Sequence, residues 1–523
     1  MANELTRRDL MIGAAGAAAL AALPRGAAAK PARLALGWEE WAAHDALGLA
    51  ALVRNKQVTP RELAQQAAAG IRAVNPRLNA VIEVWEDRVA GLDERALGDG
   101  PFRGVPFVWK DLGLGEGGRK QEQGSRLTRG SVLAADSFAA AKLKRAGVNP
   151  IARATCPEFG FTLITESTLT GVTRNPWSLD HTPGGSSGGS AALVAAGVVP
   201  MAHSDDGGGS TRIPASFCGN VGLKTSRGMV SLAPDGDHLL ASIVSELVNT
   251  RSVRDTAAAL DAMFGAAPGE PWEFAKPERP FLAEVGAPTG KLRIAVATGA
   301  FGQSTPTPEI AAETKRVAKL LEGMGHSVEE RTPQLDYEAY LRAFITIWVA
   351  GAGGQVAGIE AGTGRKAGPD NLEPIVWLAV QRARRMSLFE HLGALAVQSA
   401  TSRALGAFFE GCDVLLTPTV ARPTPEVGSR LNLLQTNVSL DEWFQPVIET
   451  VPYTPLCNFT GVPAISLPLA ELAGPHGPLP LGMHFIAPMG EDARLIRLAA
   501  ALEEAAPWRK RRPSVHVAQV AAR

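Results

Sequence analysis

The stretch from Gly184 to Pro214 constrains the fold of this chain more than any other. It reads GGSSGGSAALVAAGVVPMAHSDDGGGSTRIP and holds two glycine-flanked serines, Ser186 and Ser210. The small apolar residues between them predict a tightly packed helix over 189–196 and a buried strand over 198–203. Glycine and serine are typical of flexible linkers, but linkers are not joined to apolar runs such as ALVAAGVV. We therefore expect this segment to be ordered and central to the molecule.

Strand and helix patterns alternate along the rest of the chain, which predicts an α/β protein with a covered sheet. The predicted strands are 78–85, 105–109, 148–152, 222–226, 291–299, 327–331, 413–420, 463–470 and 481–488. The predicted helices are 38–54, 60–74, 136–146, 252–265, 308–325 and 491–505, with 336–410 mostly helical.

Length and charge narrow the class of protein further. The chain has 523 residues, 52 basic and 52 acidic, so its formal charge is zero. A neutral chain gives no reason to expect nucleic acid or an anionic lipid surface as a partner. Apolar residues make up 46% of the chain, as in a globular protein with a substantial core.

The first 29 residues differ from the rest. They contain paired arginines, Arg7 and Arg8, then a mild apolar stretch and the small-residue pattern Ala27-Ala28-Ala29. This pattern predicts a twin-arginine export signal, with the mature chain starting near Lys30. The apolar part is too short to span a bilayer comfortably. We expect a periplasmic or secreted protein that has no stable membrane insertion after the signal is removed.

Lys110 follows the short apolar strand 105–109 directly, so we expect it to be drawn inward with that strand. Consecutive strand residues face opposite ways, so Asp111 need not be its ion partner. A serine needs a base to act as a nucleophile, and a neutral lysine can be that base. Burial without a close carboxylate favours the neutral amine.

The second glycine cluster, Gly207-Gly208-Gly209-Ser210, places consecutive N–H groups beside a hydroxyl. Such a loop is suited to hold an oxyanion. Asp206 and Arg212 flank the loop, and we expect them to pair with each other or with the backbone and hold it rigid.

Together these motifs resemble the amidase signature family. The resemblance rests on Lys110 after GVPFVW, on GGSSGGSAA, on DGGGSTRIP and on FCGNVGLK, and it covers most of residues 40–510. Within the family, TRNPW, GGSSGGS, STRIPAS and RSVRD look most like the 6-aminohexanoate cyclic dimer hydrolases, which open nylon-oligomer amides.

The resemblance implies a single large domain over 30–523, with a mixed, twisted β-sheet covered by helices on both faces. Its catalytic core would lie at about 100–265 and a variable substrate-side region at about 300–450. Ser210 would be the nucleophile that forms an acyl-enzyme, and Ser186, after a cis peptide bond, would bridge it to the base Lys110. The supporting residues would be Gly185, Ser187, Asp206 and Arg212.

Two single positions and one four-residue stretch depart from the family pattern. They are Gly207, where a larger residue is frequent, Thr211, where Ile or Val is common, and Ala152-Arg153-Ala154-Thr155, where Gly-Lys-Thr is often seen.

The substrate implied is a small amide, linear or cyclic and aliphatic, with aryl amides, carbamates and peptide amides as alternatives. Aromatic residues between 300 and 450 are expected to line an apolar cleft, and we single out Tyr340, Trp348 and Trp377. No cofactor is expected, and the nine histidines lack the close spacing of metal ligands. The four cysteines are far apart, and no essential bridge is expected. A homodimer is compatible with the sequence.

Three other interpretations remain open at this point. Residues 184–188 also match G-x-S-x-G, the nucleophile elbow of α/β-hydrolases, although that motif needs a strand directly before it. A non-catalytic exported solute-binding protein would suit the size and charge. A tRNA-dependent amidotransferase subunit is a third, against which the export signal and the lack of a basic patch count.

Overall fold

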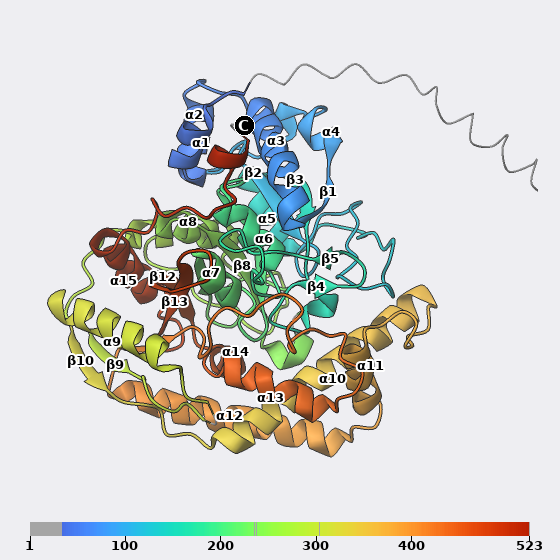
Figure 1. Ribbon diagram of the computed structural model, residues 1–523, viewed down its shortest axis with the longest axis vertical. Coiled ribbons are helices and arrows are strands. Elements are labelled where there is room, and N and C mark those ends of the chain that lie inside the picture. Colours follow the sequence, from blue (N-terminus) through green and yellow to red (C-terminus); the bar gives the residue numbers. More distant parts are fainter. Residues whose placement is uncertain (1–33, 235, 237, 303, 522–523) are drawn as a thin grey trace, which may run out of the picture. The chain divides into compact units, whose positions relative to one another are not determined.

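The computed structural model describes residues 34–521 apart from 235, 237 and 303 (Figure 1). The predicted export signal lies outside the described residues. From Ala35 onward the chain forms one unit. The division into a catalytic core and a substrate-side region stays a prediction.

The main sheet of the described chain contains eight strands in the order β10-β9-β11-β13-β12-β7-β8-β6. β9 pairs in parallel with β10 and β11, and the remaining neighbours pair antiparallel, so the sheet is mixed. The bounds are β6 (Met201–Asp206), β7 (Val221–Lys224), β8 (Ser245–Thr250), β9 (Arg293–Val296), β10 (Ser327–Glu330), β11 (Val414–Pro418), β12 (Ala464–Leu472) and β13 (Leu479–Ile486). The predicted α/β class is confirmed.

Two smaller sheets stand apart from the main one. β2 (Pro106–Lys110) pairs in parallel with β3 (Asn149–Ala154), which pairs antiparallel with β1 (Val81–Val84). β2 also contacts β6, which brings the end of the small sheet to the edge of the large one. A short hairpin joins β4 (Glu166–Ser167) and β5 (Gly171–Val172).

Helices cover the sheets and frame the site. α6 contacts β6, α7 contacts β7, β12 and β13, α8 contacts β8, and α9 and α15 contact β12. The bounds in the first half are α1 (Trp38–Ala43), α2 (Ala46–Arg54), α3 (Pro60–Leu78), α4 (Glu86–Val89), α5 (Phe138–Arg145), α6 (Gly188–Ala195), α7 (Arg212–Cys218) and α8 (Val253–Met263). Those in the second half are α9 (Pro308–Gly323), α10 (Tyr337–Thr363), α11 (Pro374–Ala383), α12 (Leu388–Glu410), α13 (Leu440–Thr450), α14 (Thr454–Thr460), α15 (Asp492–Ala505) and α16 (Val517–Val520). Short 3₁₀ turns are η1 (Glu94–Ala96), η2 (Glu158–Gly160), η3 (Leu239–Ser242) and η4 (Phe281–Glu284).

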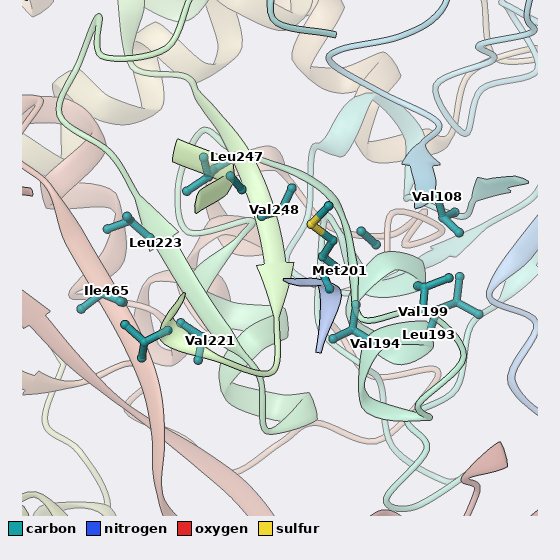
Figure 2. Packing of buried hydrophobic residues seen from close by; sticks show 14 of the residues in the cluster. Val108, Leu193, Val194, Val199, Met201, Val221, Leu223, Leu247, Val248 and Ile465 are labelled. Atoms are coloured by element: carbon teal, nitrogen blue, oxygen red, sulfur yellow. The ribbon is translucent and has the colours of Figure 1, made fainter. Parts of the chain in front are cut away.

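The core beside the predicted catalytic segment is built from small and branched side chains. Figure 2 shows side chains of α6, β2, β6, β7, β8 and β12 within one cluster. Every residue of α6 is buried, as expected for a helix made of Gly, Ala, Ser, Leu and Val. This close packing holds α6 in place and thereby sets the position of Ser186, two residues before the helix begins.

The predicted helical region 336–410 forms α10, α11 and α12, which lie together with α13 on one side of the main sheet (Figure 1). α10 packs against α11 and α12. By length and composition alone α10 could cross a membrane. Here its apolar residues contact those helices and line the pocket described below.

Two predicted elements have different boundaries in the structure. The helix 38–54 is two helices, because the Asp45 side chain accepts a hydrogen bond from the Gly48 N–H (3.0 Å) and caps the start of α2. The strand 198–203 is β6 at 201–206, because Gly197 adopts a φ of +72° and Pro200 precedes the strand. That shift adds Asp205 and Asp206 to the strand.

Candidate active site

Lys110 ends β2 with its side chain fully buried. Its side-chain nitrogen lies 2.6 Å from the Ser186 hydroxyl and also contacts the Asp205 carboxylate of β6. As the alternation of side chains along the strand allows, Asp111 does not pair with Lys110 and accepts a hydrogen bond from Arg153 (2.7 Å). One expectation was wrong: Lys110 is buried beside a carboxylate, not away from one.

Ser186 lies between the glycine turn and α6. The Gly185–Ser186 peptide bond is cis, as the family resemblance implies. A Cβ at Gly185 would lie 2.7 Å from the Ile164 backbone nitrogen, so only glycine fits there. The next residue ties this loop to its surroundings, because the Ser187 N–H donates to the Ser210 carbonyl (3.3 Å) and its hydroxyl donates to the Asp205 carbonyl (3.3 Å).

Ser210 lies between β6 and α7, where the chain turns from strand to helix. It lines a pocket together with Gly208 and is 7% exposed. Within the described chain, no hydrogen bond joins the hydroxyls of Ser186 and Ser210. The backbone bond from Ser187 holds the two serine loops together, and catalytic hydrogen bonds often tighten only when substrate binds.

The predicted oxyanion loop needs one correction. The Gly209 N–H donates to the Asp206 carboxylate (2.7 Å) and is therefore already used. Among the described residues, the N–H groups of Gly207, Gly208 and Ser210 have no hydrogen-bond partner in the protein. These three groups are free to face a substrate oxygen. Gly209 has a different role, because its φ of +128° and the closeness of Thr454 exclude any side chain there.

Asp206 and Arg212 form a buried pair below the loop, as expected. Arg212 donates through Nε and Nη2 to the carboxylate (2.9 and 2.8 Å), and Asn458 donates to it from α14 (2.9 Å). Burial alone would raise the pKa of Asp206, but the Arg212 guanidinium outweighs it and lowers the pKa to about 2. The carboxylate is therefore ionised and can hold the loop N–H groups in place.

The pocket in front of Ser210 is almost entirely apolar. One wall comes from α10, a second from α13, and a third from the loop after η2. Its side chains are Phe161, Thr162, Leu163, Ile213, Leu341, Phe344, Ile345, Trp348, Phe444, Val447, Ile448, Val451 and Pro455. Among these described lining residues none carries a charge.

Of the three aromatic residues predicted to line the cleft, only Trp348 does so. Tyr340 is 1% exposed and packs edge-on against Phe459, behind the pocket wall. Trp377, on α11, has the Arg384 guanidinium 5.4 Å from its ring centre. Both predictions were wrong because spacing along a helix does not tell which face meets the cleft.

Sequence reasoning also missed residues that complete the site. Asp205 was missed because the strand was expected to end at residue 203. A strand that runs to residue 206 places Asp205 and Asp206 on opposite faces, so that Asp205 meets Lys110 and Asp206 meets Arg212. Phe161 and Phe444 come from loops and helices outside the motifs. Asn458, which bonds Asp206, gives no signal by itself.

Fold and site together define a hydrolase of carbon–nitrogen bonds in amides. A family model described as Amidase matches residues 62–496, so the chain belongs to the amidase signature family. The predicted family is thereby confirmed.

Particular relatives sharpen this assignment. The chain is 34% identical to the 6-aminohexanoate-cyclic-dimer hydrolase of Pseudomonas sp. (strain NK87) over 485 residues, which cover 90% of this chain and 96% of the relative. It is 38% identical over 472 residues to the putative amidase AmiC of Mycobacterium tuberculosis (strain ATCC 25618 / H37Rv), covering 89% and 95%. A solved structure of 6-aminohexanoate cyclic dimer hydrolase superposes with a TM-score of 0.84 at 33% identity, covering 91% of this chain and 99% of the other.

Family membership answers two of the alternatives. A non-catalytic binding protein is not supported, since the chain belongs to a family of hydrolases. The nucleophile-elbow interpretation also fails, because the described residues directly before Ser186 form a loop and not a strand.

Proposed function

We propose that the protein hydrolyses carboxylic amides through an acyl-enzyme on Ser210. The observation that carries this proposal is the placement of Ser210 in the pocket, next to unpartnered N–H groups and to the loop that holds Ser186 against Lys110.

In the proposed mechanism, Ser186 passes its proton to the neutral amine of Lys110 and takes the proton of Ser210. The Ser210 oxygen bonds to the amide carbon, and the carbonyl electron pair moves to oxygen, where the loop N–H groups hold it. The proton returns through Ser186 to the leaving nitrogen as the C–N bond breaks. Water then attacks the ester by the same route, which releases the acid and restores Ser210.

The test replaces Ser210→Ala and follows turnover together with hydroxamate formation in the presence of hydroxylamine. We expect kcat to fall by about 10⁴-fold or more, with loss of hydroxamate, because the nucleophile is removed. Ser190→Ala is the matched control, since Ser190 is a buried serine of α6 whose hydroxyl has no hydrogen-bond partner within the described part of the chain. Retained turnover in Ser210→Ala, or acyl label on a different serine by peptide mass mapping, would contradict the proposal.

We further propose that the acyl part of the substrate is uncharged and apolar, in line with a linear or cyclic aliphatic amide. The pocket lining supports this, because moving a charge into such a site costs far more than moving a methylene chain. Aryl amides fit the aromatic walls as a second candidate.

A substrate panel tests this specificity. We expect neutral aliphatic amides and the neutral 6-aminohexanoate cyclic dimer to be hydrolysed, and analogues with a carboxylate on the acyl part to show kcat/KM at least about tenfold lower. Equal values for charged and neutral acyl groups would contradict it.

We also propose that the chain is exported by the twin-arginine pathway. The paired arginines, Arg7 and Arg8, and the alanine-rich segment after them support this. Fractionation of cells that express the full chain tests the proposal. The double variant Arg7→Lys, Arg8→Lys should remain in the cytoplasm, and unchanged export would contradict the proposal.

A further inference from the structure

Among the described residues, Asp205 is the one acid that contacts Lys110, the base of the proposed relay. Its carboxylate contacts the Lys110 nitrogen, which lies 2.6 Å from Ser186 on its other side. The Lys110 side chain is fully buried and that of Asp205 is 10% exposed. The Ser187 hydroxyl donates a hydrogen bond to the Asp205 backbone carbonyl and so helps to hold Asp205 in place. The carboxylate, the amine and the bridging hydroxyl therefore form a continuous buried row.

The other acids and bases around Lys110 are neutral or already paired. From β2 and β3, Asp111 and Arg153 pair with each other (2.7 Å). From the loop after β3, burial raises the pKa of the Cys156 thiol well above its usual value, so it stays protonated. Among the described residues, neither of these acids hydrogen-bonds the Lys110 nitrogen.

The layer behind Asp205 is neutral as well. On β8, burial and the nearby Asp205 raise the pKa of Glu246 well above its usual range. On β6, burial lowers the pKa of His203 well below its usual value, and its ring nitrogen lies 2.7 Å from the Glu246 carboxyl. Among the described residues facing Lys110, Asp205 is therefore the acid whose carboxylate contacts the Lys110 nitrogen.

We propose that Asp205 is a positioning residue that aims the lone pair of Lys110 at Ser186 and stabilises the ammonium ion formed during attack. The proposal rests on the proposed function of the relay. A neutral amine has two N–H donors and one lone pair, and a carboxylate can only accept. Asp205 therefore takes an N–H, which leaves the lone pair for the Ser186 proton.

The charge acts at the moment of proton transfer. When the Ser186 proton reaches Lys110, the nitrogen becomes positive while negative charge develops on the substrate oxygen. An adjacent carboxylate in a buried site stabilises that cation, as the aspartate does for histidine in serine proteases. A carboxylate beside an amine also favours the protonated amine, so as pH falls the enzyme should lose activity at a higher pH than it would without Asp205.

Two substitutions separate orientation from charge. Asp205→Asn keeps an oxygen acceptor and removes the charge. The acid limb of its pH profile, where kcat/KM falls as pH decreases, should therefore lie about 1 to 3 pH units below that of the wild type. Asp205→Ala removes both, and we expect kcat to fall by about 10²-fold or more with KM within about twofold. Glu246→Gln is the control. It replaces a neutral acid of β8, behind Asp205, and the acid limb of its pH profile should coincide with that of the wild type.

The outcomes decide between the possibilities. An acid limb of Asp205→Asn that coincides with the wild type, or moves to higher pH, would overturn the proposal, as would wild-type kcat in Asp205→Ala. Melting temperatures near the wild-type value establish that each variant is folded, and the pH profile reports on the charge whatever the loss of rate. Failure of the relay itself would be seen separately, as turnover retained by Ser210→Ala.

Discussion

The loop from Asp206 to Arg212 and the pocket wall formed by α10 and α13 are stabilised in opposite ways. In the loop Asp206–Arg212 the charged groups are buried and heavily bonded: Asp206 accepts from Gly209, Thr211, Arg212 and Asn458. In the wall, α10 and α13 present apolar side chains and the described lining carries no charge. The directional bonds of the loop hold particular N–H groups in particular places. The wall only has to fill space, so its residues can change and alter the substrate while the chemistry is kept.

The largest effect is expected from Arg212→Met, which tests whether the loop depends on its buried pair. The change leaves Asp206 buried without its cation, which should cost about 3 to 5 kcal/mol of unfolding free energy. Because the loop N–H groups depend on that carboxylate, kcat should fall by about 10²-fold or more.

Denaturant unfolding and steady-state kinetics measure both effects. Arg293→Met is the control, since the Arg293–Asp413 pair is half exposed and should contribute less than about 1 kcal/mol. If Arg212→Met and Arg293→Met lowered the free energy of unfolding and kcat equally, the expected difference between the buried ion pair of the loop and an exposed ion pair would be wrong.

An intermediate effect is expected from Trp348→Ala, which tests the wall. Trp348 lines the pocket and lies against the glycine loop, 3.1 Å from where a Cβ of Gly207 would be. Loss of its ring should raise KM for amides with long apolar acyl groups by about 10-fold or more, since it removes buried contact area. Trp377→Ala is the matched control on α11 and should leave KM unchanged. A larger KM change for Trp377→Ala would show that the pocket extends to α11.

The smallest effect is expected outside these two regions, where Glu158 of η2 meets Glu373, the residue directly before α11. The Glu158 carboxylate accepts from the Glu373 N–H (2.7 Å), and burial raises the pKa of Glu373 to about 7. A raised pKa means that the folded state holds its proton more tightly than the unfolded state. This contribution to stability is present below about pH 4 and is lost as pH rises through 7.

Glu373→Gln should therefore stabilise the protein at pH 8.5, by about 1 kcal/mol, and change little at pH 4. The substitution keeps the oxygen that accepts from the Thr168 N–H (2.8 Å) and alters the oxygen that has no hydrogen-bond partner among the described residues. Melting temperatures at the two pH values measure the difference. A stabilisation of equal size at both values would show that Glu373 is not the titrating group.

The residues of the proposed relay could be predicted because each of them lies in a short, local sequence pattern. The glycine directly before Ser186, the glycine directly before Ser210 and the lysine directly after an apolar strand are all local features of the sequence. The partner of Lys110 was not visible, because a strand boundary placed three residues too early hid the alternation of Asp205 and Asp206. The N–H of Gly209 was wrongly expected to face the substrate, since its use by Asp206 depends on how the loop folds back.

The amino-acid sequence by itself determined the α/β class and the family, and it predicted the three residues of the proposed relay, because each depends on residues close together in the chain or on periodic burial. Only the tertiary structure decided which acid meets Lys110, which N–H groups stay free and which side chains line the pocket. These depend on contacts between segments tens to hundreds of residues apart, such as Lys110 with Asp205 and Phe161 with Phe444. Neither local propensity nor spacing encodes the register and helix rotation that bring such residues together.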